Sequence, residues 1–210
     1  MRKLLIGLCF LLLSGVVTFF FFPQVYFATG IGQKIMMKVM GEQTARFYYS
    51  ENSALKDTLY MKGVIYSNTL DDLKEELDRN NQITTLVMLE VPGSIDDHIN
   101  LLASREIRKR NINTYIPNNG MVASGGTDMF LAGVKRNAHV TAKIGVHSWA
   151  DGDKEGGDYP ENSEVHTMYL EYYEEMNIVR DFYWFTLKAA PANAIHNMTP
   201  EEIKKYGIIN

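Results

Sequence analysis

A serine and a histidine in this sequence have the residue types and surroundings that acyl-transfer chemistry uses. Ser124 lies in residues 120–126 (Gly-Met-Val-Ala-Ser-Gly-Gly), between an expected strand over 112–116 and an expected helix over 124–133. Small neighbours let the chain turn sharply, and the free N–H groups at a helix N-terminus can hold a developing oxyanion. His147 closes the next apolar segment, where its imidazole could take the proton of the serine. This order of motifs predicts a serine nucleophile with a histidine general base.

Each of the two residues also has a plain structural interpretation. A cluster of glycine, alanine and serine before a helix is in most proteins only a turn. A lone histidine at the end of an apolar strand is often a satisfied core residue. A serine–lysine pair is disfavoured, because Lys135 and Lys143 follow Ser124 too closely in the sequence and Lys188 is too distant.

The elements that must position these residues alternate regularly from residue 58 onward. Apolar runs and helical spacings predict strands over 59–65, 84–90, 112–116 and 143–148, and helices over 70–77, 95–107 and 124–133. Ser94 with Asp97 is expected to cap the second of these helices. An aromatic-rich helix is expected over 163–188, and a short capped helix begins near Thr199. The alternation predicts an α/β domain over 58–210, with a mainly parallel sheet covered by helices on both sides.

The N-terminus predicts export from the cytoplasm. Arg2 and Lys3 precede nineteen uncharged residues, 4–22, which is typical of a signal peptide or a membrane anchor. We expect this segment to cover 1–30, with cleavage after Gly30 and retention as an anchor both left open, and a connector to cover 31–57. The protein would then be periplasmic, or anchored and facing outside the cytoplasm.

Composition excludes several classes of function. The only cysteine, Cys9, lies in the apolar segment, so the exported part has no disulfide, thiolate metal site or cysteine nucleophile. The net charge is −4 with both signs interspersed, which does not favour nucleic acid as a partner. No cofactor or metal is expected. The aromatic residues of 163–188 favour core packing, or alternatively a contact in a homo-oligomer.

A series of motifs resembles the Clp protease proteolytic subunit/crotonase superfamily across residues 59–209. They are the first strand at 60–65, Glu90-Val91-Pro92-Gly93-Ser94 in place of a Pro-Gly-Gly oxyanion loop, Gly120-x-x-Ala123-Ser124, Ile144-Gly145-Val146-His147, and the closing segment 199–209. The likeness is closest to periplasmic Clp-protease-like proteins. Ala-Ser-Gly-Gly and Ile-Gly-Val are also similar to signal peptide peptidase A.

The resemblance implies an exported serine peptidase or acyl hydrolase that acts on a peptide or protein. Ser124 would be the nucleophile and His147 the general base, while the N–H groups of Gly125 and of Gly93 or Ser94 would form the oxyanion hole. The family's orienting aspartate has no acidic counterpart here, so Asn193 is expected to accept the imidazole N–H instead. A turn role for Asn193, and a catalytically retired protein acting in assembly or peptide binding, stay open.

Overall fold

The computed structural model describes residues 44–49 and 56–210. The described residues belong to one compact unit, Thr44–Asn210. The expected signal peptide or anchor over 1–30 lies outside the described residues, as does most of the expected connector. Within the described ranges, no helix combines the length and apolarity that a membrane crossing requires. This unit begins earlier than expected, because the end of the connector supplies a strand.

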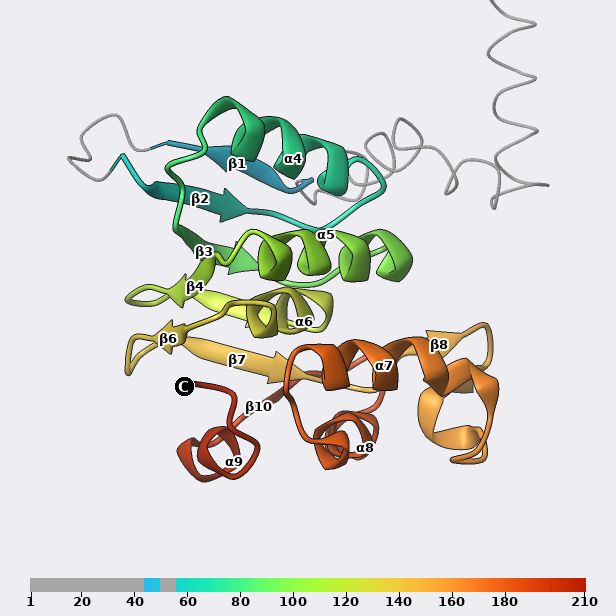
Figure 1. Ribbon diagram of the computed structural model, residues 1–210. Coiled ribbons are helices and arrows are strands. Elements are labelled where there is room, and N and C mark those ends of the chain that lie inside the picture. Colours follow the sequence, from blue (N-terminus) through green and yellow to red (C-terminus); the bar gives the residue numbers. More distant parts are fainter. Residues whose placement is uncertain (1–43, 50–55) are drawn as a thin grey trace, which may run out of the picture. The chain divides into compact units, whose positions relative to one another are not determined.

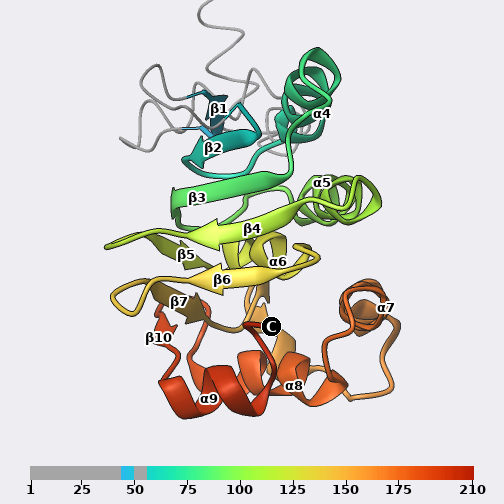
Figure 2. The same cartoon turned by 60° about the vertical axis from the view of Figure 1, so that its left-hand side comes forward.

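A mainly parallel sheet forks at β3 (Figures 1 and 2). The first residues of β3 pair with β4 and its last residues pair with β5, so the sheet continues in two branches. Only the β1–β2 and β7–β10 pairs of this sheet are antiparallel. Its strands are β1 (Arg46–Tyr48), β2 (Thr58–Lys62), β3 (Thr85–Val91), β4 (Asn113–Ile116), β5 (Met121–Ala123), β6 (Arg136–Ala138), β7 (Lys143–Val146) and β10 (His196–Asn197). A separate hairpin consists of β8 (Ala150–Asp151) and β9 (Lys154–Glu155).

The helix that follows Ser124 lies at the fork of the sheet. The described α-helices are α4 (Thr69–Arg79), α5 (Asp97–Lys109), α6 (Gly125–Leu131), α7 (Thr167–Glu175), α8 (Arg180–Ala189) and α9 (Pro200–Lys205). The first three lie in a row in front of the sheet in Figure 1, and α6 contacts strands of both branches. The start of α6 is therefore fixed from two sides.

The expected fold class is confirmed in its architecture: a mainly parallel α/β sheet with helices packed on it. Three details of the prediction were wrong. The long helix over 163–188 is interrupted between α7 and α8, where Asn177 adopts a left-handed backbone with φ 56°. Asp96, and not Ser94, caps α5, because its carboxylate accepts from the N–H of Ile99. The short strands β5 and β10 were not anticipated.

The aromatic residues of the broken helix do pack in the core. Tyr172 and Phe182 have no exposed surface, and Tyr183 is 1% exposed. All three rings contact the ring of Tyr173, at centroid distances of 5.7 Å for Tyr172, 5.5 Å for Phe182 and 6.0 Å for Tyr183. This packing attaches α7 and α8 to the sheet beside α6.

Candidate active site

Ser124 occupies a sharp turn between β5 and α6. Its backbone has φ 52° and ψ −130°, a combination that L-residues rarely adopt and that costs about 1–3 kcal/mol. Three backbone hydrogen bonds hold it there: its N–H donates to the Gly145 carbonyl at 3.1 Å, and its own carbonyl accepts from the N–H groups of Thr127 at 2.8 Å and Asp128 at 3.2 Å. No described residue forms a hydrogen bond with its hydroxyl. The strain therefore presents an unengaged hydroxyl at the end of the sheet.

The loop after β3 packs directly against this turn. Gly93 has φ 156°, and a Cβ placed on it would lie 3.2 Å from the Cβ of Ser124. A Cβ on Gly125 would lie only 2.2 Å from the Ser94 hydroxyl oxygen. Only glycine fits at these two positions, so the sequence lets two backbone segments approach each other closely. The N–H groups of Ser94 and Gly125 have no acceptor among the described residues, which leaves both available to an oxyanion.

The serine in the oxyanion loop does not disturb this arrangement. The unusual backbone angle falls on Gly93, whereas Ser94 makes a parallel bridge with Ile65. The Ser94 hydroxyl donates to the carboxylate of Asp97. The buried Asn100 amide donates to the Gly125 carbonyl at 3.0 Å and fixes the nucleophile turn from behind.

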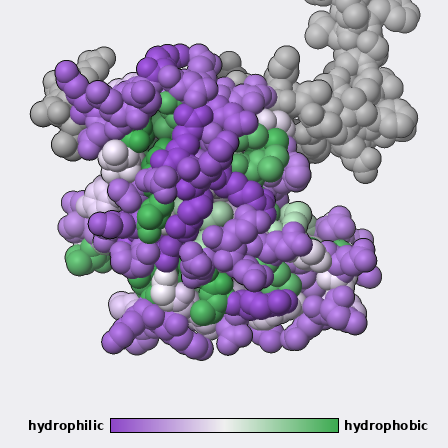
Figure 3. Space-filling model, in the orientation of Figure 1, coloured by the Kyte–Doolittle hydropathy of each residue, from purple (hydrophilic) through white to green (hydrophobic). Residues whose placement is uncertain are grey.

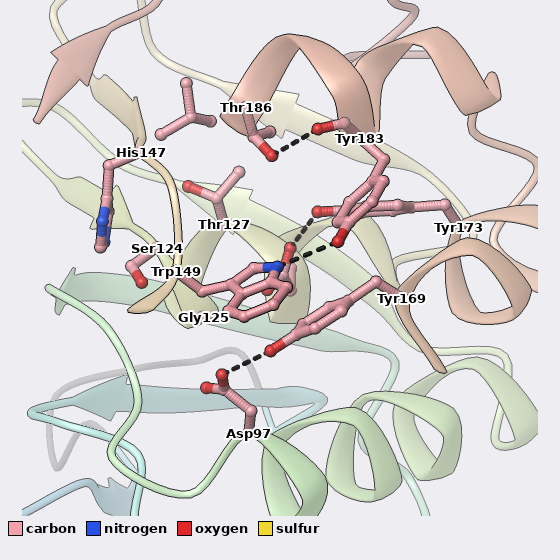
Figure 4. Close-up of a pocket in the computed structure, with 12 residues that line it drawn as sticks. Asp97, Ser124, Gly125, Thr127, His147, Trp149, Tyr169, Tyr173, Tyr183 and Thr186 are labelled. Carbon is pink, nitrogen blue, oxygen red and sulfur yellow. Dashed lines mark hydrogen bonds between the residues drawn. The ribbon is translucent and has the colours of Figure 1, made fainter. Parts of the chain in front are cut away.

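His147 follows β7 and lines the same pocket as Ser124. Figure 4 shows its imidazole beside the serine side chain. Its Nδ1 atom is buried and has no hydrogen-bond partner in the described part of the chain. The structure thus brings together the predicted nucleophile and base, but it leaves the orienting position of the base unfilled by these residues.

The expected hydrogen bond from His147 to Asn193 was wrong. Asn193 is exposed in a turn that the Ala194 N–H closes by donating to the Pro191 carbonyl at 3.0 Å. Asparagine favours such turns because its short amide tolerates their backbone angles. His196 does not replace it, since its Nε2 pairs with the Glu202 carboxylate at 2.8 Å. The turn interpretation of Asn193 is the correct one.

Sequence reasoning missed the inner part of the pocket. There, two carboxylates and a set of aromatic rings line the wall beyond the serine: Asp97, Asp128, Trp149, Tyr169, Tyr173 and Tyr183. Burial raises the pKa of Asp128 to about 7, and the Asp97 charge adds to this, while the Tyr173 hydroxyl opposes it. Asp128 follows Ser124 by one turn of α6, and this spacing in the sequence could have indicated that the two residues lie close together. The aromatic wall could not be predicted from the sequence, because it depends on how α7 and α8 pack.

Comparison with known proteins supports the fold. No protein-family model and no curated protein sequence matches the chain. Among solved structures, a mutant of the 1510-N membrane-bound stomatin-specific protease, in complex with a substrate peptide, is similar with 18% identity and a TM-score of 0.50, covering 72% of this chain and 71% of its own. The ClpP protease catalytic domain from Plasmodium falciparum is similar with 18% identity and a TM-score of 0.51, covering 74% of this chain and 83% of its own. At this identity the likeness defines a fold.

Proposed function

We propose that this protein is a serine peptidase-like hydrolase that cleaves a peptide or a related acyl substrate. Ser124 is the nucleophile, His147 is the general base, and the N–H groups of Gly125 and of Ser94 or Gly93 bind the oxyanion. The observation that carries the proposal is the strained turn at Ser124. The loop at Gly93 packs on this turn at a distance that requires glycine, and His147 lies in the same pocket. The fold's similarity to two proteases agrees with it.

The chemistry follows from these positions. The Ser124 oxygen attacks the substrate carbonyl carbon, the carbonyl electron pair moves onto oxygen, and the serine proton passes to His147. The N–H donors stabilise the resulting oxyanion. His147 then gives the proton to the leaving nitrogen or oxygen as the bond to carbon breaks. Water, deprotonated by His147, attacks the acyl-enzyme and releases the acid, which restores the Ser124 hydroxyl.

Labelling of the full-length chain with a neutral fluorophosphonate tests the nucleophile. We expect the wild type to be labelled at Ser124 and the Ser124→Ala variant to lose labelling by roughly 10³-fold or more. Ser163→Ala is the matched control, because this serine begins a short helix remote in sequence from the turn and caps it with no side-chain hydrogen bond. Equal labelling of wild type and Ser124→Ala would refute the assignment.

One observation favours a second candidate, a catalytically retired protein that binds peptides. The buried Nδ1 of His147 lacks a partner among the described residues, and a general base without an orienting acceptor works poorly. This candidate predicts that the wild type is not labelled and that wild type and Ser124→Ala bind peptides with equal affinity. Labelling of the wild type at Ser124 would exclude it.

We also propose that the chain is exported, from Arg2-Lys3 and the uncharged residues 4–22. The catalytic unit would then work outside the cytoplasm, either released or held at the membrane by this segment. A reporter that is active only outside the cytoplasm, fused after Asn210, should be active. Exchange of Arg2 and Lys3 for glutamate should reduce its activity, and an inactive fusion of the unchanged chain would refute export.

A further inference from the structure

The inner part of the Ser124 pocket carries two carboxylates from neighbouring helices. Asp97, labelled in Figure 4, stands at the start of α5. Asp128 stands in α6, one turn beyond Ser124. Tyr169 donates to Asp97 at 2.7 Å, and Tyr173 donates to Asp128 at 2.6 Å. Each carboxylate is therefore fixed in place by a neutral hydroxyl.

Neither carboxylate forms an ion pair with a positively charged side chain among residues 44–49 and 56–210. One oxygen of Asp128, Oδ2, also has no hydrogen-bond partner in the described part of the chain. Burial raises the pKa values of Tyr169 and Tyr173 as well, so these hydroxyls remain protonated donors. The pocket therefore holds two carboxylates, of which Asp128 becomes negatively charged as the pH rises through about 7, and it offers a free acceptor.

Aromatic rings form the opposite wall. Trp149 stacks on Tyr169 with ring centroids 6.0 Å apart, and Tyr169 stacks on Tyr183 at 5.6 Å. The indole N–H of Trp149 donates to the Tyr183 hydroxyl at 2.9 Å, which fixes the indole in the pocket. Carboxylates beside aromatic rings favour a cation on an apolar stem, because the carboxylates accept its N–H groups and the rings pack against the stem.

We propose that this pocket is the specificity site of the enzyme and that it receives a positively charged side chain, lysine or arginine, next to the carbonyl that Ser124 attacks. The inference depends on the proposed function, because the pocket is continuous with Ser124 and Gly125. The apolar stem of the side chain passes the aromatic wall, and the cationic end meets Asp128 and Asp97. Substrates with a neutral side chain at this position lose these contacts.

A binding experiment tests the pocket independently of catalysis. Trp149 lines the pocket, so n-butylammonium, a mimic of the lysine side chain, should change the tryptophan fluorescence of the full-length chain saturably. 1-Butanol, which has the same length without the charge, should not. Trp149→Phe should abolish the change, which separates it from any signal of Trp184.

Charge variants supply the decisive comparison. Asp128→Asn keeps an acceptor for Tyr173 and should weaken n-butylammonium binding about tenfold or more, and Asp97→Asn should weaken it as well. Asp153→Asn is the matched control, because it removes one negative charge from the exposed turn of the β8–β9 hairpin. Equal responses to n-butylammonium and 1-butanol, or equal effects of Asp128→Asn and Asp153→Asn, would overturn the proposal.

Covalent probes then connect the pocket to the reaction. Two phosphonate esters that differ only in a lysine-like or a norleucine-like side chain should label Ser124 at rates that differ by about tenfold or more, in favour of the cation. Asp128→Asn should lower this ratio. If a neutral fluorophosphonate labels Ser124 but the two esters react equally, the specificity pocket is refuted and the hydrolase proposal stands. If n-butylammonium binds as expected but no probe labels Ser124, the pocket stands as a cation site and the hydrolase proposal fails.

Discussion

Ser124 and His147 line one pocket, but the chain constrains them very differently. The serine lies in a strained turn that three backbone hydrogen bonds hold in place. Gly93 and Gly125 pack closely around it, and the buried Asn100 lies behind it. The histidine lies after the last residue of β7, and its buried Nδ1 has no partner in the described part of the chain. The nucleophile and oxyanion side is fixed by backbone, whereas the base side depends on one side chain.

This difference separates two contributions to catalysis. Preorganised N–H donors stabilise the oxyanion whatever the state of the base, and this is usually the larger single effect. Orientation of the imidazole determines how well the proton is transferred, and loss of the orienting group can reduce turnover by about 10⁴-fold. Under the proposed function, we therefore expect a slow serine–histidine pair with an intact oxyanion site. Variants on each side can test that division.

The largest effect is expected on the constrained side, from Gly125→Ala. The new methyl would lie 2.2 Å from the Ser94 hydroxyl oxygen and 2.8 Å from the Asn100 amide, so either the loop or the turn must move. We expect a loss of fluorophosphonate labelling of about 10²–10³-fold, as for removal of an oxyanion donor, and destabilisation of about 1–3 kcal/mol in denaturant unfolding.

Gly157→Ala is the matched control for this change. A Cβ on Gly157 would have its closest contact at 3.7 Å, to the Leu187 carbonyl, which is an ordinary distance. This variant should label and unfold like the wild type. Labelling of Gly125→Ala at the wild-type rate would show that the close approach of the two segments has no part in the chemistry.

A smaller loss is expected on the base side, from His147→Gln. Loss of a general base costs about 10²–10⁴-fold, and the lower end applies here because the imidazole is not oriented by a described partner. His139→Gln, a change at an exposed histidine, is the control. An unchanged labelling rate in His147→Gln would remove this residue from the mechanism.

The sequence predicted the Ser124 turn and its glycine loop, which the backbone fixes, better than it predicted the side chains around His147. Glycines 93, 120, 125 and 126 mark the turns in the chain itself, since a requirement for glycine is local, and the α/β alternation orders the strands. The fork at β3 and the break near Asn177 depend on which segments pack together, and no local pattern records that. Likewise, Asn193 was assigned by its place before the last helix, but its local Pro-Ala-Asn-Ala sequence forms an exposed turn instead.

A separate effect concerns the dependence of the fold's stability on pH, which we expect to come from Asp128 in α6. Asp128 has a pKa of about 7 in the folded chain against 3.8 when unperturbed, because burial disfavours its charge. The ionisable groups that act on it or are acted on by it are Asp97, Tyr169, Tyr172, Tyr173 and Tyr183. The folded state thus binds the proton more tightly, so this group's contribution to stability is complete below about pH 4 and is lost as the pH rises through 7.

Asp128→Asn removes that loss. Its Tm should exceed that of the wild type by roughly 8–16 °C at pH 8, because a pKa raised from 3.8 to about 7 corresponds to about 4 kcal/mol, and the difference should shrink toward pH 4. Asp153→Asn should show no such trend. A difference that stays constant between pH 4 and pH 8 would mean that the Asp128 carboxylate titrates normally in the folded state.

The smallest effect is expected from Asn193, and it decides how the base side works. The side chain of Asn193 is exposed in its turn and has no hydrogen bond to His147, so Asn193→Ala should leave labelling within about twofold of the wild type. Asn193→Asp should likewise give no gain, because a carboxylate at an exposed position without contact to Nδ1 cannot stabilise the imidazolium. Both rates can be measured with the same fluorophosphonate across pH 5–9. A tenfold change in either variant would mean that Asn193 reaches the imidazole during the reaction, and the serine–histidine pair would then be a triad.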